Sequence, residues 1–235
     1  ASVNHDGADE NIAIGFNALR GGSGEVDRCV AIGTYALDST AHHDHTGSIA
    51  IGGNALEDLT SGANNTAVGY QAGKDMTTAE DCTIIGYQAG LDAGSRSTLI
   101  GKNAGGAITS GGVNNVCVGK DAGDVIEGGD WNTIIGTGAD PSGATTTNQT
   151  VVGYSATGVA DNSVTLGNAD VTKVYMSQDG DAEMYANGTI NTSDKRLKED
   201  ISDCDLGLEF LKALRPVSYK FKNDKILGRP RRHHK

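Results

Sequence analysis

Hydrophobic and polar positions recur along this chain in one short pattern. Most copies have Asn, Ser or Cys, then a β-branched residue, a variable residue, Ile or Val, Gly, two further residues and Ala. Nine clear copies run from NIAIGFNA (11–18) to QTVVGYSA (149–156), and SVTLGNAD (163–170) is a weaker tenth. Their glycines, mostly 17 or 18 residues apart, stand at positions 15, 33, 52, 69, 86, 101, 119, 136, 153 and 167. Such self-similarity indicates a repeat architecture.

Each copy predicts a short strand, a corner and a loop. The β-branched residue and the Ile or Val two positions later alternate to the same face of the strand, and we expect that face to point inward. Gly permits a tight turn or a close approach between coils, and the Ala packs at a second corner. With coils stacked about 4.7 Å apart, residues 1–170 are predicted to form an all-β, parallel β-roll or solenoid of about ten coils.

The variable position between the two expected inward residues predicts an apolar stripe on the outer face. Such a stripe needs a partner, and a homotrimer would bury it around the axis. The alternative is a strand buried on both faces within one monomer. The stripe consists of Ala13, Ala31, Ala50, Ala67, Ile84, Leu99, Cys117, Ile134 and Val151.

Composition and charge exclude several functions. With 34 Gly and only 5% aromatic residues, the chain lacks the large apolar core of a conventional globule. A formal net charge of -11 makes nucleic acid an improbable partner, and no apolar run approaches the ~20 residues of a membrane span. No signal peptide is visible after Ala1, and the chain does not begin with Met, so we expect a processed or partly represented protein.

The cysteines are predicted to be free structural thiols. Cys29 and Cys82 begin their copies three coils apart, roughly 14 Å by strand spacing, which exceeds the reach of a disulfide. Cys117 is expected on the opposite face, and Cys204 lies beyond the repeat. Small buried slots are the usual place for such residues.

Histidines and aromatic residues supply the other candidate chemistry. His43 and His45 form a His-x-His pair in the segment AHHDHT (41–46). They either lie in a solvated loop or, in a trimer, present six imidazoles to one transition metal. We predict the solvated loop, with no metal and no cofactor.

Aromatic side chains follow the glycine in several copies. Tyr70 and Tyr87 should stack on adjacent coils, and Phe16 and Tyr154 hold the same position. The alternatives are a ladder that stabilises coil pairing and a strip that binds glycans. Trp131, the only Trp, lies in a Gly-rich loop where it could stack on a sugar ring.

Beyond residue 170 the pattern stops. Residues 171–192 contain the turn signals Asp179-Gly180 and Asn187-Gly188 between β-prone runs, which predict a β-meander that caps the roll as a neck. Residues 193–235 then combine a helical pattern, SDCDLGLEFLKALRP, with a strand-like VSYKF. We predict a small α+β segment there.

Two resemblances follow from these residues. The NSVAIG-like coil over about 11–170 resembles the β-roll head repeat of trimeric autotransporter adhesins. GTINTSDKRLKEDI and LGLEFLKALRPVSYKFK, at 188–222, resemble the start of the intramolecular-chaperone self-processing domain of phage endosialidases and tail fibres. That resemblance implies a domain that trimerises, guides folding of a β-fibre and cuts itself off with a Ser–Lys dyad. The family's domain continues further, so we expect this one to be incomplete.

Carried onto this sequence, the resemblance makes Ser193 the nucleophile and Lys198 its general base. A Ser hydroxyl needs a neighbouring base, and a Lys serves only if desolvation or nearby cations lower its pKa. Lys195 and Arg196 are close enough to contribute. The alternative is a plain helix N-terminus, capped by Ser193 or Asp194, with Lys198 in solvent. Any catalysis is expected to be one self-cleavage beside Ser193, without an external substrate.

These observations predict a homotrimeric fibre or spike segment of a virion surface appendage. Its loops would contact a glycan or protein receptor on the host surface, and other virion proteins would adjoin it. One alternative is a trimeric adhesin on a bacterial cell surface. The other is a glycan-degrading tailspike, which requires paired carboxylates that the sequence does not locate.

Overall fold

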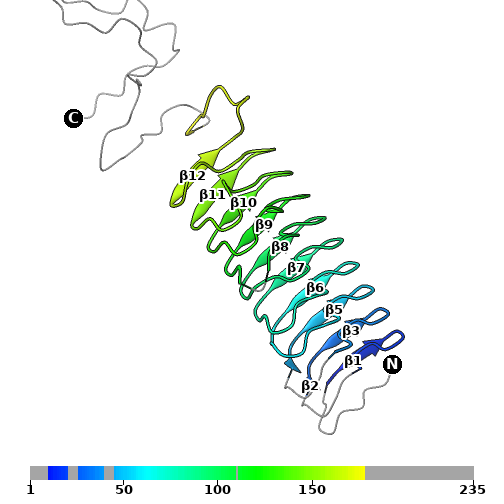
Figure 1. Cartoon of the computed structure of the whole chain (residues 1–235). Coiled ribbons are helices and arrows are strands. Elements are labelled where there is room, and N and C mark those ends of the chain that lie inside the picture. The colour runs from blue at the N-terminus through cyan, green and yellow to red at the C-terminus, as the bar shows by residue number, and fades with distance from the viewer. Residues whose placement is uncertain (1–9, 21–25, 40–44, 110, 178–235) are drawn as a thin grey trace, which may run out of the picture. The chain divides into compact units, whose positions relative to one another are not determined.

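The computed structural model describes residues 10–20, 26–39, 45–109 and 111–177, all within one compact unit, 1–180. Ten three- or four-residue strands form one parallel sheet (Figure 1). Its order is β1 (Ile12–Ile14), β3 (Val30–Ile32), β5 (Ile49–Ile51), β6 (Thr66–Val68), β7 (Thr83–Ile85), β8 (Thr98–Ile100), β9 (Val116–Val118), β10 (Thr133–Ile135), β11 (Gln149–Val152) and β12 (Ser163–Leu166). The described residues contain no helix. The predicted all-β parallel solenoid is confirmed.

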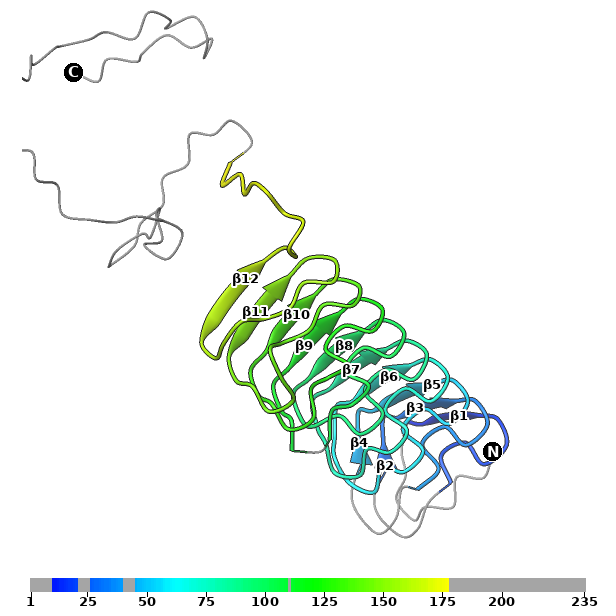
Figure 2. The same cartoon turned by 45° about the horizontal axis from the view of Figure 1, so that its top comes forward.

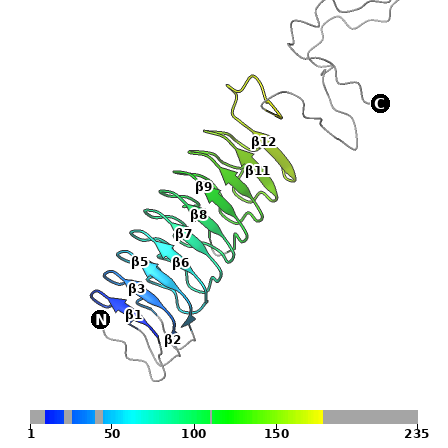
Figure 3. The ribbon, with the colours of Figure 1, turned by 180° about the vertical axis from the view of Figure 1, so that it is seen from behind.

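Each strand of the sheet falls in one copy of the repeat, and all the copies pair in one register. Ile84 of β7, for example, pairs with Ala67 on one side and Leu99 on the other. The strands stack in chain order, as the views from two sides show (Figures 1 and 3). The solenoid has about eight turns. A second, two-stranded sheet pairs β2 (Val26–Asp27) with β4 (His45–Thr46) near the end that carries β1 (Figure 2).

The prediction of which strand face points inward is wrong. The variable middle residue is the buried one, fully so from β3 to β11, whereas the flanking Ile51 and Ile85 are 36% and 38% exposed. The interior is narrow, so the middle position takes side chains as small as Ala31. The β-branched residues on either side of it occupy the pleated outer surface, which suits them. From β7 onward the middle position also takes larger side chains, such as Ile84 and Leu99. Size and hydropathy had pointed to the opposite assignment.

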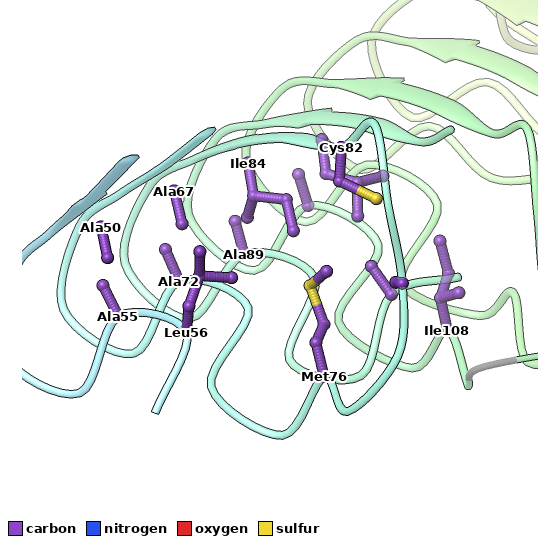
Figure 4. Packing of buried hydrophobic residues seen from close by; sticks show 14 of the residues in the cluster. Ala50, Ala55, Leu56, Ala67, Ala72, Met76, Cys82, Ile84, Ala89 and Ile108 are labelled. Carbon is purple, nitrogen blue, oxygen red and sulfur yellow. The ribbon is translucent and has the colours of Figure 1, made fainter. Parts of the chain in front are cut away.

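The interior keeps its packing by exchanging volume between two positions. In the nine clear copies the third residue after the glycine is a buried Ala, and the fourth is Leu in the first three copies but Gly in the next four. Leu56 accompanies the small Ala50 within its coil (Figure 4). Gly90 accompanies Ile84, and in the coil before it, where Ala67 and Gly73 are both small, Met76 lies against Gly73 instead. A Cβ atom at Gly90 would lie only 2.4 Å from Cδ1 of Leu99. A large side chain at this corner and large side chains in the middle of the strands therefore cannot share the interior space.

The predicted close approach at the repeat glycine is confirmed. Gly86 has a φ of 144°, and a Cβ atom there would lie 2.3 Å from the carbonyl oxygen of Gly101 on the next coil. Gly69 is placed in the same way, with φ 141° and 2.3 Å to the oxygen of Gly86. Any side chain at this column would separate the coils.

A buried polar ladder, which the sequence analysis did not anticipate, runs along the first position of the copies. Asn115 accepts a hydrogen bond at Oδ1 from the backbone N–H of Asn132 (3.0 Å) and donates through Nδ2 to the carbonyl of Gly129 (2.7 Å). Asn132 in turn accepts from the backbone N–H of Gln149 at 3.0 Å. The side chains thus link adjacent coils at a point where the interior would otherwise leave backbone groups unpaired.

Three cysteines are free and buried, as predicted: Cys29, Cys82 and Cys117. Burial raises the pKa of each thiol, that of Cys117 to about 12. The expectation that Cys117 points to the opposite face from the other two is wrong. Cys29 and Cys82 precede their strands by one residue and Cys117 is the middle residue of β9, so all three alternate to the inside.

Several predictions lie outside the described residues: Cys204, the remainder of the β-meander at 178–192 and the α+β segment at 193–235. Residues 171–177 form no strand.

Candidate functional site: the outer face of the sheet

Two columns of side chains form the outer face of the ten-stranded sheet, and this name is used below for them together. The first column precedes each middle residue: Ile12, Val30, Ile49, Thr66, Thr83, Thr98, Val116, Thr133, Thr150 and Val164. The second column precedes each repeat glycine: Ile14, Ile32, Ile51, Val68, Ile85, Ile100, Val118, Ile135, Val152 and Leu166.

The outer face carries no charged side chain, and apolar side chains run along its whole length. The second column is Ile, Val or Leu in every copy, and the first adds only Thr to these types. Exposure at this face is 40% for Ile135 and 58% for Ile14, and it reaches 67% for Val164. An apolar surface this continuous is typical of an interaction site, and the absence of charge is typical of an interface core.

The outer face can bind a partner by burying apolar side chains. Strands β3 to β11 are paired on both sides, so their backbone groups are satisfied within the sheet. The columns carry no titratable side chain, and the hydroxyl groups of Thr are their only polar side-chain groups. A partner would therefore be held by shape and by removal of apolar side chains from water.

The aromatic residues that follow the repeat glycines form a short ladder. Tyr70 and Tyr87 stack with ring centroids 5.6 Å apart and planes 22° apart, as predicted. Gly53 lies next to the Tyr70 ring, and the Nζ of Lys102 lies 5.9 Å from the Tyr87 centroid, so each ring has a neighbour within the solenoid on its other side. The arrangement favours the ladder that stabilises coil pairing over the glycan strip. Tyr154, 71% exposed, has no part in this stack.

Charged side chains lie on the loops and corners. Lys74 lies 2.7 Å from Asp75 and 3.7 Å from Asp58, and the hydrogen bond to Asp75 raises the pKa of its ammonium group. The hydrogen bond from Lys120 lowers the pKa of Asp121. These exposed pairs add little stability.

Asp140 differs from the acidic residues of these exposed pairs. Its Oδ1 is buried without a hydrogen-bond partner in the described structure. Burial, and next the charge of Asp124, raise the pKa of this carboxyl group. Its ionised form is therefore disfavoured in the folded solenoid.

The structure describes some of the predicted site residues and not others. Ser193, Lys198 and His43 lie outside it, and His45 is described only as part of the backbone of β4. Trp131 is described and is 58% exposed. The described part of the chain brings no three His, Cys, Asp or Glu side chains together as metal ligands. Nor does that part contain a helix with the length and hydropathy of a membrane span.

The sequence pattern did not predict the outer face as a site, because the residues that form it were expected to point inward. One signal could have identified it: the first position of each copy is polar or small and lies on the same side as the middle residue. Polar residues are ordinarily expected on the outside, but Asn115 and Asn132 are buried and hydrogen-bonded.

In the comparison with known proteins, the model of one family matches part of the chain. Residues 193–234 match the model of the family described as chaperone of endosialidase. No curated protein and no solved structure matches the chain. The chain thus carries a parallel β-solenoid in its described part and, at residues 193–234, a segment similar to the chaperone of endosialidase.

Proposed function

We propose that this chain is part of a trimeric phage tail fibre or spike, in which the solenoid at 1–170 is the shaft. The segments 171–192 and 193–235 would serve as its neck and as a chaperone that assists trimer folding. The outer face carries this proposal, because a continuous, uncharged apolar surface needs a partner. The match at 193–234 supports the choice of partner, since that family is associated with trimer assembly.

In the proposed trimer, three solenoids lie side by side with their outer faces toward the common axis. The outer face contributes twenty side chains per chain, ten from each column. A standard protein interface uses about 20–30 residues a side, so the face is large enough for stable association. Loops and corners would stay outside, available for attachment of the virion to a glycan or protein receptor on its host.

The test replaces apolar residues at matched exposure. Ile85 and Ile135, 38% and 40% exposed, lie on the outer face, whereas Val125, 41% exposed, lies on a loop. We expect the Ile85→Lys/Ile135→Lys variant to dissociate, because a buried unpaired ammonium group is costly. Val125→Lys should remain trimeric. Native mass spectrometry and sedimentation give the oligomeric state, and circular dichroism checks that the β-structure survives.

Two results of this experiment would overturn the proposal. One is a monomeric unmodified chain at micromolar concentration. The other is a trimer that tolerates both lysines on the outer face as well as it tolerates the lysine at Val125.

The resemblance also supports a self-cleavage step, which we include in the proposal. Ser193 would attack the bond beside it with Lys198 as the base, and Ser193 is the first residue of the matched segment. The mass of the complete gene product measures cleavage directly. Chains that end near residue 193, together with uncut chains from both Ser193→Ala and Lys198→Ala, are expected. If the unmodified chain stays uncut, the proposed self-cleavage is refuted, whereas the proposed trimeric shaft is unaffected.

A further inference from the structure

Trp131 occupies a corner that the solenoid otherwise gives to small or polar residues. The corner lies five residues before each repeat glycine, and its residues are called the corner column below. Every member has a left-handed φ, between 55° and 70°. The column consists of Glu10, Arg28, Gly47, Asn64, Asp81, Arg96, Asn114, Trp131, Asn148 and Asn162. Asn, Asp and Gly suit this backbone conformation, whereas a bulky aromatic residue there is unusual.

Side chains of the corner column bind one another from coil to coil. Asn64 donates to Asp81 at 3.1 Å, Arg96 to Asn114 at 3.0 Å, and Asn148 to Asn162 at 2.9 Å. These hydrogen bonds form a ladder that an Asn at position 131 would continue.

Trp131 interrupts this ladder between Asn114 and Asn148, which lie on the coils before and after it. Its backbone N–H bonds the carbonyl of Val113 at 3.2 Å, so the corner itself forms normally. Its side chain is 58% exposed, and the ring contacts found among the described residues do not include it. The chain thus exposes more than half of a large aromatic side chain to water, in an unfavourable backbone conformation. Such a feature suggests a binding role.

The two neighbours of Trp131 offer complementary hydrogen-bonding groups. Asn114 uses Oδ1 to accept from Arg96 and keeps its Nδ2 group as a donor. Asn148 uses Nδ2 to donate to Asn162 and keeps Oδ1 as an acceptor. An indole ring between an amide donor and an amide acceptor matches a pyranose ring, which has apolar C–H faces and hydroxyl groups at its edge.

We propose that Trp131 is the stacking platform of a carbohydrate-binding site, flanked by Asn114 and Asn148. The ligand is a neutral oligosaccharide that runs along the corner column, with successive coils about 4.8 Å apart. A polyanionic glycan is disfavoured because Asp130 and Glu127 are close in sequence and the chain carries a net charge of -11. The inference deepens the proposed attachment role and rests on it, although the site is complete within one chain.

Trp131 is the only Trp in the chain, so intrinsic fluorescence reports directly on the site. The full chain is titrated with neutral tetra- to hexasaccharides built from glucose, galactose, mannose or N-acetylglucosamine, and with one sialylated oligosaccharide. We expect at least one neutral sugar to shift the emission saturably and the sialylated sugar to bind at least tenfold more weakly. No saturable response to any neutral sugar, or stronger binding of the sialylated one, would overturn the proposal.

A variant series separates stacking from folding. Trp131→Asn restores a residue suited to the corner column, so it should keep its thermal stability and lose at least tenfold in affinity, measured by calorimetry. Trp131→Phe should retain part of the affinity. Tyr154→Asn, at an even more exposed aromatic residue elsewhere, should bind as the unmodified chain does. Unchanged affinity of Trp131→Asn would refute the site.

The oligomeric state of the same samples distinguishes this inference from the proposed function. A trimer without a sugar response overturns the carbohydrate site alone. A monomer with a saturable response overturns the trimeric shaft and leaves the site.

Discussion

The exchange of volume between corner and strand predicts an energetic coupling between Gly90 and Leu99. In Gly90→Ala the new methyl group would meet Cδ1 of Leu99 at 2.4 Å and Cβ of Ala93 at 3.2 Å. Its φ of 48° is also left-handed, although Leu56 adopts the same conformation at the equivalent corner. The backbone therefore accepts a side chain at this point, and the obstacle is the occupied space.

The expected magnitudes follow from these contacts. Gly90→Ala should cost about 1–2 kcal/mol for the left-handed conformation and about 1–3 kcal/mol for overpacking. Leu99→Ala should cost about 2–5 kcal/mol through the lost burial and the cavity. In the double variant the overpacking disappears and the methyl group fills part of the cavity. It should therefore be less destabilised than the sum of the single variants by about 1–3 kcal/mol.

Urea unfolding of the full chain, followed by circular dichroism at one protein concentration, measures this coupling. Comparison requires equal m-values, so that a change in midpoint reports stability. Gly128→Ala is the matched control, since a Cβ atom there would meet nothing within 4 Å; it should change stability by less than about 0.5 kcal/mol. If the effects of Gly90→Ala and Leu99→Ala add to within about 0.5 kcal/mol, the proposed exchange of volume is refuted.

Three further predictions concern buried polar groups. Because the pKa of Asp140 is raised on folding, the stability from its protonated form is full below the unfolded pKa of about 3.9 and is lost as the pH rises through the folded pKa. Asp140→Asn should therefore raise the melting temperature at pH 7 more than at pH 4, and an equal gain at both would contradict this. Iodoacetamide at pH 8 should spare Cys117, with its pKa of about 12, until urea is added, as peptide mass spectrometry would show. Asn115→Ala should cost about 1–3 kcal/mol for each buried group left unpaired, here the N–H of Asn132 and the carbonyl of Gly129. Asn115→Ser should cost less in the same urea assay, because Ser97 accepts the equivalent backbone bond at 3.4 Å.

Much of the fold could be predicted from the sequence because its signal repeats. Every strand of the ten-stranded sheet lies in a copy of the pattern, and the glycine column has the close approach expected of it. The Tyr70–Tyr87 stack followed from the position of both residues after a glycine. A residue's position within its copy can be determined from the local sequence. Because coils stack in register, residues at the same position of neighbouring copies lie next to each other.

The assignment of strand faces required information that local pattern does not contain. Alternation identifies which residues share a face, but it does not say which face is inside. In a conventional core the larger apolar residues are buried, and that rule favoured Ile32 over Ala31. The width of the coil decides otherwise, and it depends on the corners that face the strand, such as Leu37, fully buried. Ser193 and Lys198 remain predictions for a related reason, since five positions of separation do not bring two side chains together without a fold around them.

The reversed faces strengthen the reasoning that led to a trimer. The stripe first expected outside contains Ala in four of its nine positions, and burying Ala removes little apolar area from water. The observed outer face instead presents Ile, Val or Leu before every repeat glycine, and a fully buried side chain of this kind contributes about 1.5–3 kcal/mol. The narrow interior takes one middle side chain per strand, which is Ala in the first four strands of the sheet and Ile, Leu, Cys or Val from β7 to β11. The core of one chain is therefore modest, and the apolar outer face offers stability that only association can supply. Alternation along each strand thus accounts for both a filled narrow coil and an outer face suited to assembly.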